Sequence, residues 1–267
     1  MKAVILAAGF GTRLQRDIEN DTSGKYSNLK GVPKPLLPIG DRPLVTHWID
    51  TLKGISQIDQ VIVMTNGANH AAFEEWQKSY PHVKLICDGA LSNETRSGAV
   101  ACMNQAATKG NIEDDMLVIA GDTLFLDDFN LTTILQRHQE FKSRDENASM
   151  LVYVTCTDEE VHKYGILELD ANSRVTNFLE KPSPEETLSR KECPCFYVFN
   201  KNSLHCLSDF LDEMKDSPLK AKDATGNFVA YLYKKKPVYA TEISGRFDVG
   251  GLPSYLTCHE HFLSKAS

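Results

Sequence analysis

Short apolar runs alternate with longer amphipathic stretches in the first half of the chain. The apolar runs predict buried strands over 3–7, 60–65, 83–87 and 116–120. The amphipathic stretches predict helices near 43–53, 70–79, 96–107 and 129–142. Strands that alternate with helices form parallel sheets, because each helix carries the chain back across the sheet. We therefore expect a largely parallel sheet with helices on both faces.

The second half of the chain has a different pattern of apolar and polar positions. Strand-like segments with short connections lie at 149–155, 164–169, 174–179 and 195–199, and helical patterns lie near 203–214, 224–233 and 253–264. Short connections favour antiparallel strands added to the same sheet. With no repeat or linker visible, residues 1–267 are expected to form a single α/β domain, a three-layer α/β/α sandwich with a mixed, mainly parallel sheet.

Composition narrows the class of protein. No apolar run approaches the roughly 20 residues of a membrane span, and the N-terminus lacks a signal-sequence pattern, so no membrane association is expected. Seven scattered cysteines, an odd number, favour reduced thiols in the cytoplasm. A formal net charge of −7 argues against nucleic acid as a partner.

The opening stretch holds two candidate phosphate-binding elements, LAAGFGTRL at 6–14 and PKPLLPI at 33–39. Gly9 and Gly11 follow the first predicted strand and let the backbone turn sharply and approach a ligand. Arg13 adds a planar, always-charged donor that suits phosphate oxygens. Lys34 stands between two prolines, which stiffen its loop. Together these features predict polyphosphate binding.

Common nucleotide motifs do not fit this stretch. The P-loop pattern G-x-x-x-x-G-K-[ST] is absent, and Leu14 stands where a dinucleotide fingerprint needs its third glycine. For the glycine pair alone, an ordinary turn is an equal alternative, but Arg13 and the Pro-Lys-Pro loop weigh against it. The polar segment 15–32 between the two elements is either a mobile flap over the site or a tolerated surface insertion.

Further motifs follow in a fixed order along the chain. They are GDTLF at 121–125, YGILELD at 164–170, FLEKP at 178–182, YVFN at 197–200 and FDVGGLPSY at 247–255. With the two opening elements, this series resembles the sugar-1-phosphate nucleotidylyltransferases, closest in pattern to small single-domain glucose-1-phosphate thymidylyl-, uridylyl- and cytidylyltransferases. The resemblance implies a Rossmann-like fold, with a nucleotide-binding half at 1–125 and a sugar-phosphate-binding half at 126–267.

The resemblance also implies a reaction. A nucleoside triphosphate and a sugar-1-phosphate are expected to give a nucleotide-sugar and pyrophosphate, with Mg²⁺ as cofactor. Asp122 follows a central strand at the edge where open α/β sheets bind ligands. By the family match, Asp122 and Asp248 hold the metal. Arg13 would stabilise the departing phosphates, and Lys34 would reach toward the α-phosphate.

Substrate-binding positions are carried over from the same family motifs. The residues assigned to nucleotide binding are Leu6, Ala8, Gly9, Gly11, Thr12, Arg13, Lys34, Asn93 and Gly98. On the sugar side, Lys181 would hold the phosphate, Glu180 would accept sugar hydroxyls, and Gly165 would let the sugar approach the backbone.

Two segments depart from the family pattern. The glutamine common in thymidylyl and uridylyl relatives is not evident in 88–103, where Asn93 and Arg96 are candidate replacements, and Asn93 is equally a helix cap. The segment CPCFYVFN at 193–200 has Pro194 and Cys195 where relatives carry small residues against the sugar. The base, the sugar and the formation of a homo-oligomer therefore stay open.

Two alternative functions remain at this point. A cytidylyltransferase for a non-sugar phosphate such as phosphocholine would share the opening elements, but FLEKP counts against it. A catalytically silent regulatory subunit would bind nucleotide-sugar without turnover. Retention of Arg13, Lys34, Asp122, Lys181 and Asp248 counts against that reading.

Overall fold

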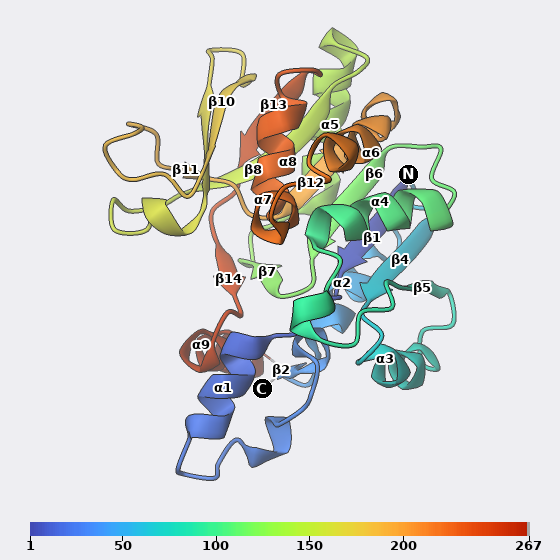
Figure 1. The fold of residues 1–267 in the computed structure, drawn as a ribbon, viewed down its shortest axis with the longest axis vertical. Coiled ribbons are helices and arrows are strands. Elements are labelled where there is room, and N and C mark those ends of the chain that lie inside the picture. Colours follow the sequence, from blue (N-terminus) through green and yellow to red (C-terminus); the bar gives the residue numbers. More distant parts are fainter. Residues whose placement is uncertain (266–267) are drawn as a thin grey trace.

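A ten-stranded mixed sheet forms the centre of the computed structural model, which describes residues 1–265 (Figure 1). Its strands are β1 (Lys2–Leu6), β4 (Gln60–Thr65), β5 (Val83–Cys87), β6 (Met116–Ala120), β8 (Ser149–Thr155), β9 (Gly165–Leu169), β10 (Val175–Glu180), β11 (Lys191–Glu192), β12 (Phe196–Phe199) and β13 (Val238–Glu242). The order across the sheet is β10-β9-β11-β8-β12-β6-β1-β4-β5, with β13 also paired to β8.

The direction of the strands changes between the two halves of the chain. β6, β1, β4 and β5 run parallel to one another, as the alternating pattern predicted. β12 then inserts antiparallel between β6 and β8, so one sheet joins both halves. The remaining pairs among β8, β11, β9 and β10 are antiparallel, while β13 is parallel to β8. The expected mixed sheet is confirmed.

Helices cover both faces of this sheet. They are α1 (Thr12–Asn20), α2 (Leu44–Leu52), α3 (His70–Gln77), α4 (Ala99–Lys109), α5 (Leu131–Arg144), α6 (His205–Glu213), α7 (Leu219–Asp223), α8 (Thr225–Leu232) and α9 (Leu252–Leu263). Every helix that the sequence predicted is present. Within residues 1–265, no helix combines the length and the apolar character needed to cross a bilayer.

Alternating strand residues divide the core into two layers. In β1, Ala3 and Ile5 join the cluster under α2, α5 and α9, whereas Val4 joins the cluster under α4, α6 and α8. Successive side chains of a strand point to opposite faces, so both faces of the sheet are buried. The near-continuous apolar runs of the central strands follow from this double burial.

The segment 15–32 begins inside a helix and contains a short helical turn at Ser27–Leu29. Residues 15–20 lie in α1, whose Leu14 and Ile18 are buried one turn apart. The Asp17 carboxylate accepts the backbone N–H of Leu252 at 3.1 Å, at the start of α9. With α9 this helix forms the projection at the bottom of Figure 1. A role of this segment in gating the site stays a prediction.

Two small ladders lie outside the central sheet. β2 (Pro38–Ile39) pairs with β3 (Arg42–Pro43), directly after the Pro-Lys-Pro loop. β7 (Thr123–Phe125) pairs antiparallel with β14 (Arg246–Asp248). The second ladder connects the motifs at 121–125 and 247–255, and no local pattern in the sequence indicates it.

Candidate active site

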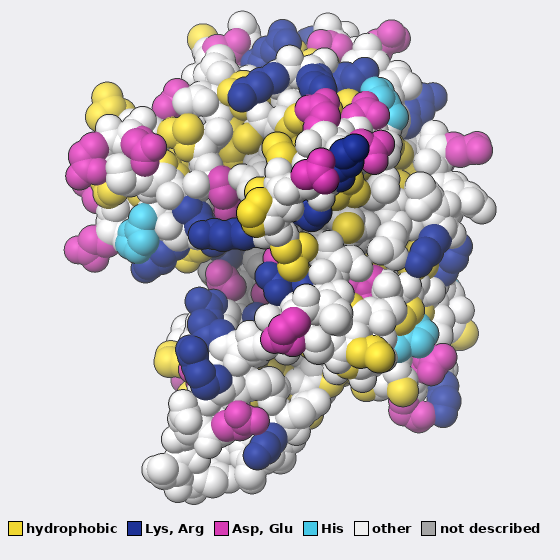
Figure 2. All heavy atoms as spheres, viewed as in Figure 1, with side chains coloured by type: hydrophobic (Ala, Val, Ile, Leu, Met, Phe, Trp, Pro, Cys, Tyr) yellow, Lys and Arg dark blue, Asp and Glu magenta, His cyan; other side chains and the backbone are white. Residues whose placement is uncertain are grey.

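Two adjoining cavities open where β1, β5 and β6 end. The larger has a volume of about 960 Å³ and the smaller about 440 Å³. They share a wall made by Ala120, Asp122, Glu180, Lys181, Cys195, Ala224 and Thr225. Each cavity is lined by residues from both halves of the chain. Figure 2 shows a hollow between the lower projection and the body above it, with Lys and Arg side chains on both sides.

The opening loop lines the larger cavity. Leu6, Ala8, Gly9 and Gly11 all face it. Gly11 has a left-handed φ of 61°, which a residue with a side chain rarely adopts and which turns the chain into α1. Thr12 begins that helix and lines neither of the two cavities.

Of the two predicted metal ligands, Asp122 directly precedes β7 and Asp248 ends the neighbouring strand β14. The N–H of Gly121 donates to the carbonyl of Leu6 at 2.9 Å, and a Cβ on Gly121 would lie 2.5 Å from that oxygen. Glycine therefore lets the chain pass close to β1 just before Asp122. The β7–β14 ladder then places Asp248 opposite Thr123, and the N–H of Val249 donates to the carbonyl of Asp122 at 2.9 Å. Both carboxylates line the smaller cavity.

Two predicted phosphate-binding cations lie beside these aspartates. The Lys34 ammonium is 3.0 Å from the Asp122 carboxylate, and its side chain is only 14% exposed. Arg13 lines the smaller cavity, and its Nε donates to the carbonyl of Gly250 at 2.7 Å. Gly250 follows Asp248 in the FDVGG motif. The structure thus brings both opening elements to the aspartates of two distant motifs.

Lys181 has an unusual backbone conformation. Its φ is 54°, in the left-handed region that costs a non-glycine residue about 1–3 kcal/mol. Its N–H donates to the carbonyl of Tyr164 at 3.0 Å, which holds the turn. Within residues 1–265, no hydrogen bond or ion pair engages its ammonium group, which lines both cavities. Strain of this kind is typical of functional sites, and here it presents a cation to the shared wall.

Glu180 is half-buried in the same wall, and its carboxylate accepts no hydrogen bond from the described residues. Burial raises the pKa of Glu180 above the ordinary value of 4.5, and the neighbouring Lys181 opposes that shift. The ionised carboxylate is therefore held at a cost to stability.

We expect Glu180→Gln to raise the melting temperature near neutral pH. Because the folded-state pKa is raised, the folded protein binds the proton more tightly, and stability falls as the pH rises through that pKa. Glutamine keeps the shape and removes the charge. The gain should shrink as the pH falls toward 4.5 and vanish below it. Thermal unfolding across this range measures the effect, and a gain that is independent of pH would contradict it.

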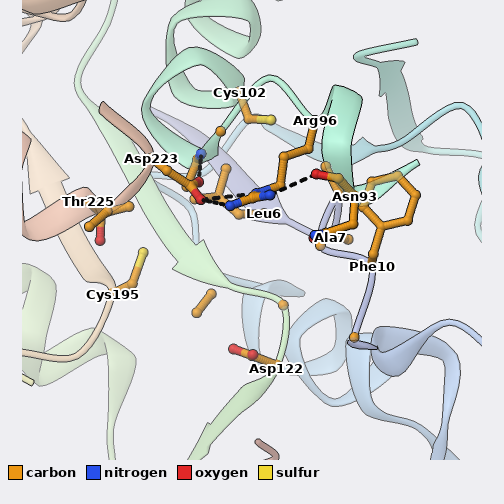
Figure 3. A pocket seen from close by; sticks show the side chains of 18 of the residues that line it. Leu6, Ala7, Phe10, Asn93, Arg96, Cys102, Asp122, Cys195, Asp223 and Thr225 are labelled. Carbon is orange, nitrogen blue, oxygen red and sulfur yellow. Dashed lines mark hydrogen bonds and ion pairs between the residues drawn. The ribbon is translucent and has the colours of Figure 1, made fainter. Parts of the chain in front are cut away.

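Asp223, at the end of α7, lines the larger cavity. Figure 3 shows its carboxylate joined to Arg96. The Arg96 Nε donates to Asp223 Oδ2 at 3.1 Å, and the N–H of Ala99 donates to Oδ1 at 2.9 Å. A further guanidinium nitrogen of Arg96 donates to the carbonyl of Asn93 at 2.7 Å. Arg96 is thus held by Asp223 and Asn93 while it lines the larger cavity, and its part in base recognition stays a prediction.

Gly98 precedes α4 and lies close to Asp223. It has a φ of 91°, and a Cβ placed on it would lie 3.2 Å from the Cα of Asp223. Both Asn93 and Gly98 line the larger cavity. Their contact with a base stays a prediction. The contribution of α7 to this cavity could not be predicted from the sequence, because the Arg96–Asp223 ion pair joins residues 127 positions apart.

Sequence reasoning also missed a buried ion pair behind the aspartates. The Arg246 Nε donates to the Glu192 carboxylate at 2.6 Å, and the two side chains are 9% and 6% exposed. The same guanidinium lies 3.3 Å from Asp248 and 4.8 Å from the centre of the Tyr164 ring. Because Arg246 precedes Asp248 by two positions, strand periodicity could have placed both on one face.

Comparison with known proteins decides the classification. A family model described as nucleotidyl transferase matches residues 2–265. The chain belongs to this family. A UTP–glucose-1-phosphate uridylyltransferase of Synechocystis sp. is 27% identical over 99% of this chain and 64% of its own length. A bifunctional protein GlmU of Methanococcus maripaludis is 26% identical over 99% of this chain and 55% of its own length. The chain thus spans little more than half the length of these curated relatives.

Solved structures of nucleotidyl transferases share the fold. An apo UDP-glucose pyrophosphorylase aligns over 100% of both chains with a TM-score of 0.77 and 17% identity. A putative glucose-1-phosphate thymidylyltransferase from Bacillus anthracis aligns over 98% of this chain and 95% of its own, with a TM-score of 0.72 and 19% identity. These similarities confirm the Rossmann-like sandwich.

The thiols of this nucleotidyl transferase are poor candidates for nucleophiles. All seven cysteines are free. Burial raises the pKa of Cys195, on the shared wall, to about 12. Burial and the nearby Asp88 likewise raise the pKa of Cys102 in the larger cavity to about 12. Since the thiolate is the reactive form, neither side chain is activated at neutral pH.

The donor set at the cavities fits a hard cation. Asp122 and Asp248 offer carboxylate oxygens, and their side chains are 40% and 36% exposed. Mg²⁺ characteristically takes one or two carboxylates together with phosphate oxygens and waters. A second potential metal cluster among the described residues, His205, Cys206 and Asp209, lies on α6 and lines neither cavity.

Proposed function

We propose that this chain is a Mg²⁺-dependent sugar-1-phosphate nucleotidylyltransferase, which joins a nucleoside triphosphate and a sugar-1-phosphate. The observation that carries the proposal is the meeting of two carboxylates and three cations at adjoining cavities: Asp122, Asp248, Arg13, Lys34 and Lys181. They come from five separate sequence motifs. Membership in the nucleotidyl transferase family supports the same activity.

The two cavities suit two substrates. The larger, bounded by the opening loop and the start of α4, would take the nucleotide, and the smaller would take the sugar phosphate. Two further structural neighbours, a UDP-glucose pyrophosphorylase and a UGPase, are described with UDP-glucose and UTP bound. The shared wall would place the two phosphate groups next to each other, with Lys181 between them.

Positioning and charge neutralisation account for the chemistry. A phosphate oxygen of the sugar-1-phosphate attacks the α-phosphorus and forms a new P–O bond. The bond from the α-phosphorus to the bridging oxygen breaks, and its electron pair leaves with pyrophosphate. Lys34 and Arg13 would offset charge on the triphosphate, and Lys181 would orient the attacking group. No protein nucleophile is needed, in keeping with the unactivated thiols.

Asp122 and Asp248 would hold the magnesium ion. When bound, the ion supplies charge stabilisation for the phosphate oxygens during transfer. Lys34 lies 3.0 Å from Asp122 and would act from the same edge of the cavity. We also propose that the enzyme works in the reducing cytoplasm, which its free thiols support, and that its partners are its two substrates. Homo-oligomer formation is left to measurement in solution.

A substrate grid tests the proposal. Pyrophosphate release is measured for each common nucleoside triphosphate against a panel of sugar-1-phosphates and phosphocholine, with Mg²⁺. We expect turnover with at least one sugar-1-phosphate and its loss on chelation of the metal. Turnover with phosphocholine alone would reject the sugar substrate. Nucleotide-sugar binding without turnover in any well would instead indicate a silent subunit.

A further inference from the structure

The carboxylate of Glu180 lies in a slot between two glycines from different elements. Glu180 ends β10, and the register places it directly opposite Gly165 at the start of β9. Gly226 is the second residue of α8, which packs against β10. A Cβ on Gly226 would lie 1.9 Å from Glu180 Oε2, and a Cβ on Gly165 would lie 3.1 Å from the same oxygen. Both glycines are buried.

The slot has a rigid back wall. Phe178 precedes Glu180 by two positions on the same face of β10 and is 4% exposed. A Cβ on Gly165 would lie 2.5 Å from its ring, and a Cβ on Gly226 would lie 2.9 Å from it. The ring fills the space toward the core, so the carboxylate cannot move that way. It stays in the wall that the two cavities share.

We propose that Gly226, together with Gly165, is a positioning residue that sets which sugar phosphates the enzyme accepts. This inference rests on the proposed function. A carboxylate without a hydrogen-bond partner in the described residues is an acceptor only, and it suits two hydroxyls of a bound sugar. An acceptor fixed in place favours one arrangement of hydroxyls, because a misplaced or missing hydroxyl leaves the buried group unpaired. Gly226 would thereby act on specificity through the position of the Glu180 carboxylate.

Gly226→Ala provides the direct test. The added methyl group would push the carboxylate out of the slot toward the cavities. We expect KM for the preferred sugar-1-phosphate to rise about tenfold or more, while KM for the triphosphate stays within about twofold. Discrimination against a sugar-1-phosphate that differs at one hydroxyl should also weaken. Steady-state kinetics with each substrate varied in turn measures these effects.

A double-mutant cycle identifies the contact. Glu180→Asp shortens the side chain and leaves room for the methyl group. In the Glu180→Asp background, Gly226→Ala should therefore change KM for the sugar phosphate by less than about twofold. A similar tenfold rise in KM for the sugar phosphate in both backgrounds would contradict the proposal that Gly226 positions Glu180. If Gly226→Ala alone fails to fold, recovery of folding in the double variant supports the contact, and failure of both variants overturns it.

Ala230→Gly is the matched control, since it weakens the same helix without approaching Glu180. It should lower the melting temperature and leave both KM values and the selectivity unchanged. The wild-type protein is assayed first, because absence of turnover there counts against the proposed function itself. Normal selectivity in a folded, active Gly226→Ala enzyme would contradict the role of Gly226 and leave the proposed function intact.

Discussion

Asp248→Asn is expected to reduce pyrophosphate release on the order of 10³-fold while the protein stays folded. Asparagine keeps the shape of the side chain and removes the charge that would hold half of the metal site. A bound metal typically supplies several kcal/mol of charge stabilisation, and each 1.4 kcal/mol corresponds to about tenfold in rate. The Asp248 side chain is 36% exposed, so the fold should tolerate its neutralisation.

Activity and metal dependence are measured together. The dependence of the rate on Mg²⁺ concentration should shift to higher concentrations in Asp248→Asn, and circular dichroism should show the native fold. Asp127→Asn is the control, since Asp127 is 54% exposed, lines neither cavity and should change turnover little. Near-normal activity in Asp248→Asn would remove this residue from the metal site.

The regular part of the fold was accessible from the sequence because its signals are local. The apolar run at 60–65 matches β4, and the pattern near 129–142 matches α5 within two residues at each end. α1 was missed because Leu14 and Ile18 are its only buried residues in a polar stretch. The insertion of β12 between β6 and β8 was also beyond local patterns, since its partners are set by packing rather than by neighbouring residues.

Candidate site residues could be predicted only where they lie inside a sequence motif. Lys34, Asp122 and Asp248 could be recognised as candidates because each lies inside a recognisable segment, and the structure places all three at the adjoining cavities. Asp223 and Glu192 could not be assigned. They pair with Arg96 and Arg246, and each pair joins positions more than 50 residues apart. Charge partners of this kind are fixed by tertiary packing, which leaves no local signature.

Arg246→Met is expected to destabilise the protein by about 3–5 kcal/mol. Its guanidinium contacts Glu192, and both side chains are less than 10% exposed. Without arginine, the Glu192 carboxylate would remain buried and unpaired, which costs far more than the ion pair itself contributes. Asp248 would lose the same neighbour, so turnover should fall as well. Chemical denaturation and pyrophosphate release measure the two effects.

A second substitution separates stability from function. In the Arg246→Met, Glu192→Met double variant no charge is left buried, so most of the lost stability should return. Turnover should stay low, because the double variant still lacks the Arg246 guanidinium. In the unsubstituted protein this group lies 3.3 Å from Asp248 and orients its carboxylate. Lys78→Met, which breaks an ion pair with both partners more than 70% exposed, should alter stability and activity little. If activity returned along with stability, the role of Arg246 would be structural only, and its contact with Asp248 would not contribute to catalysis.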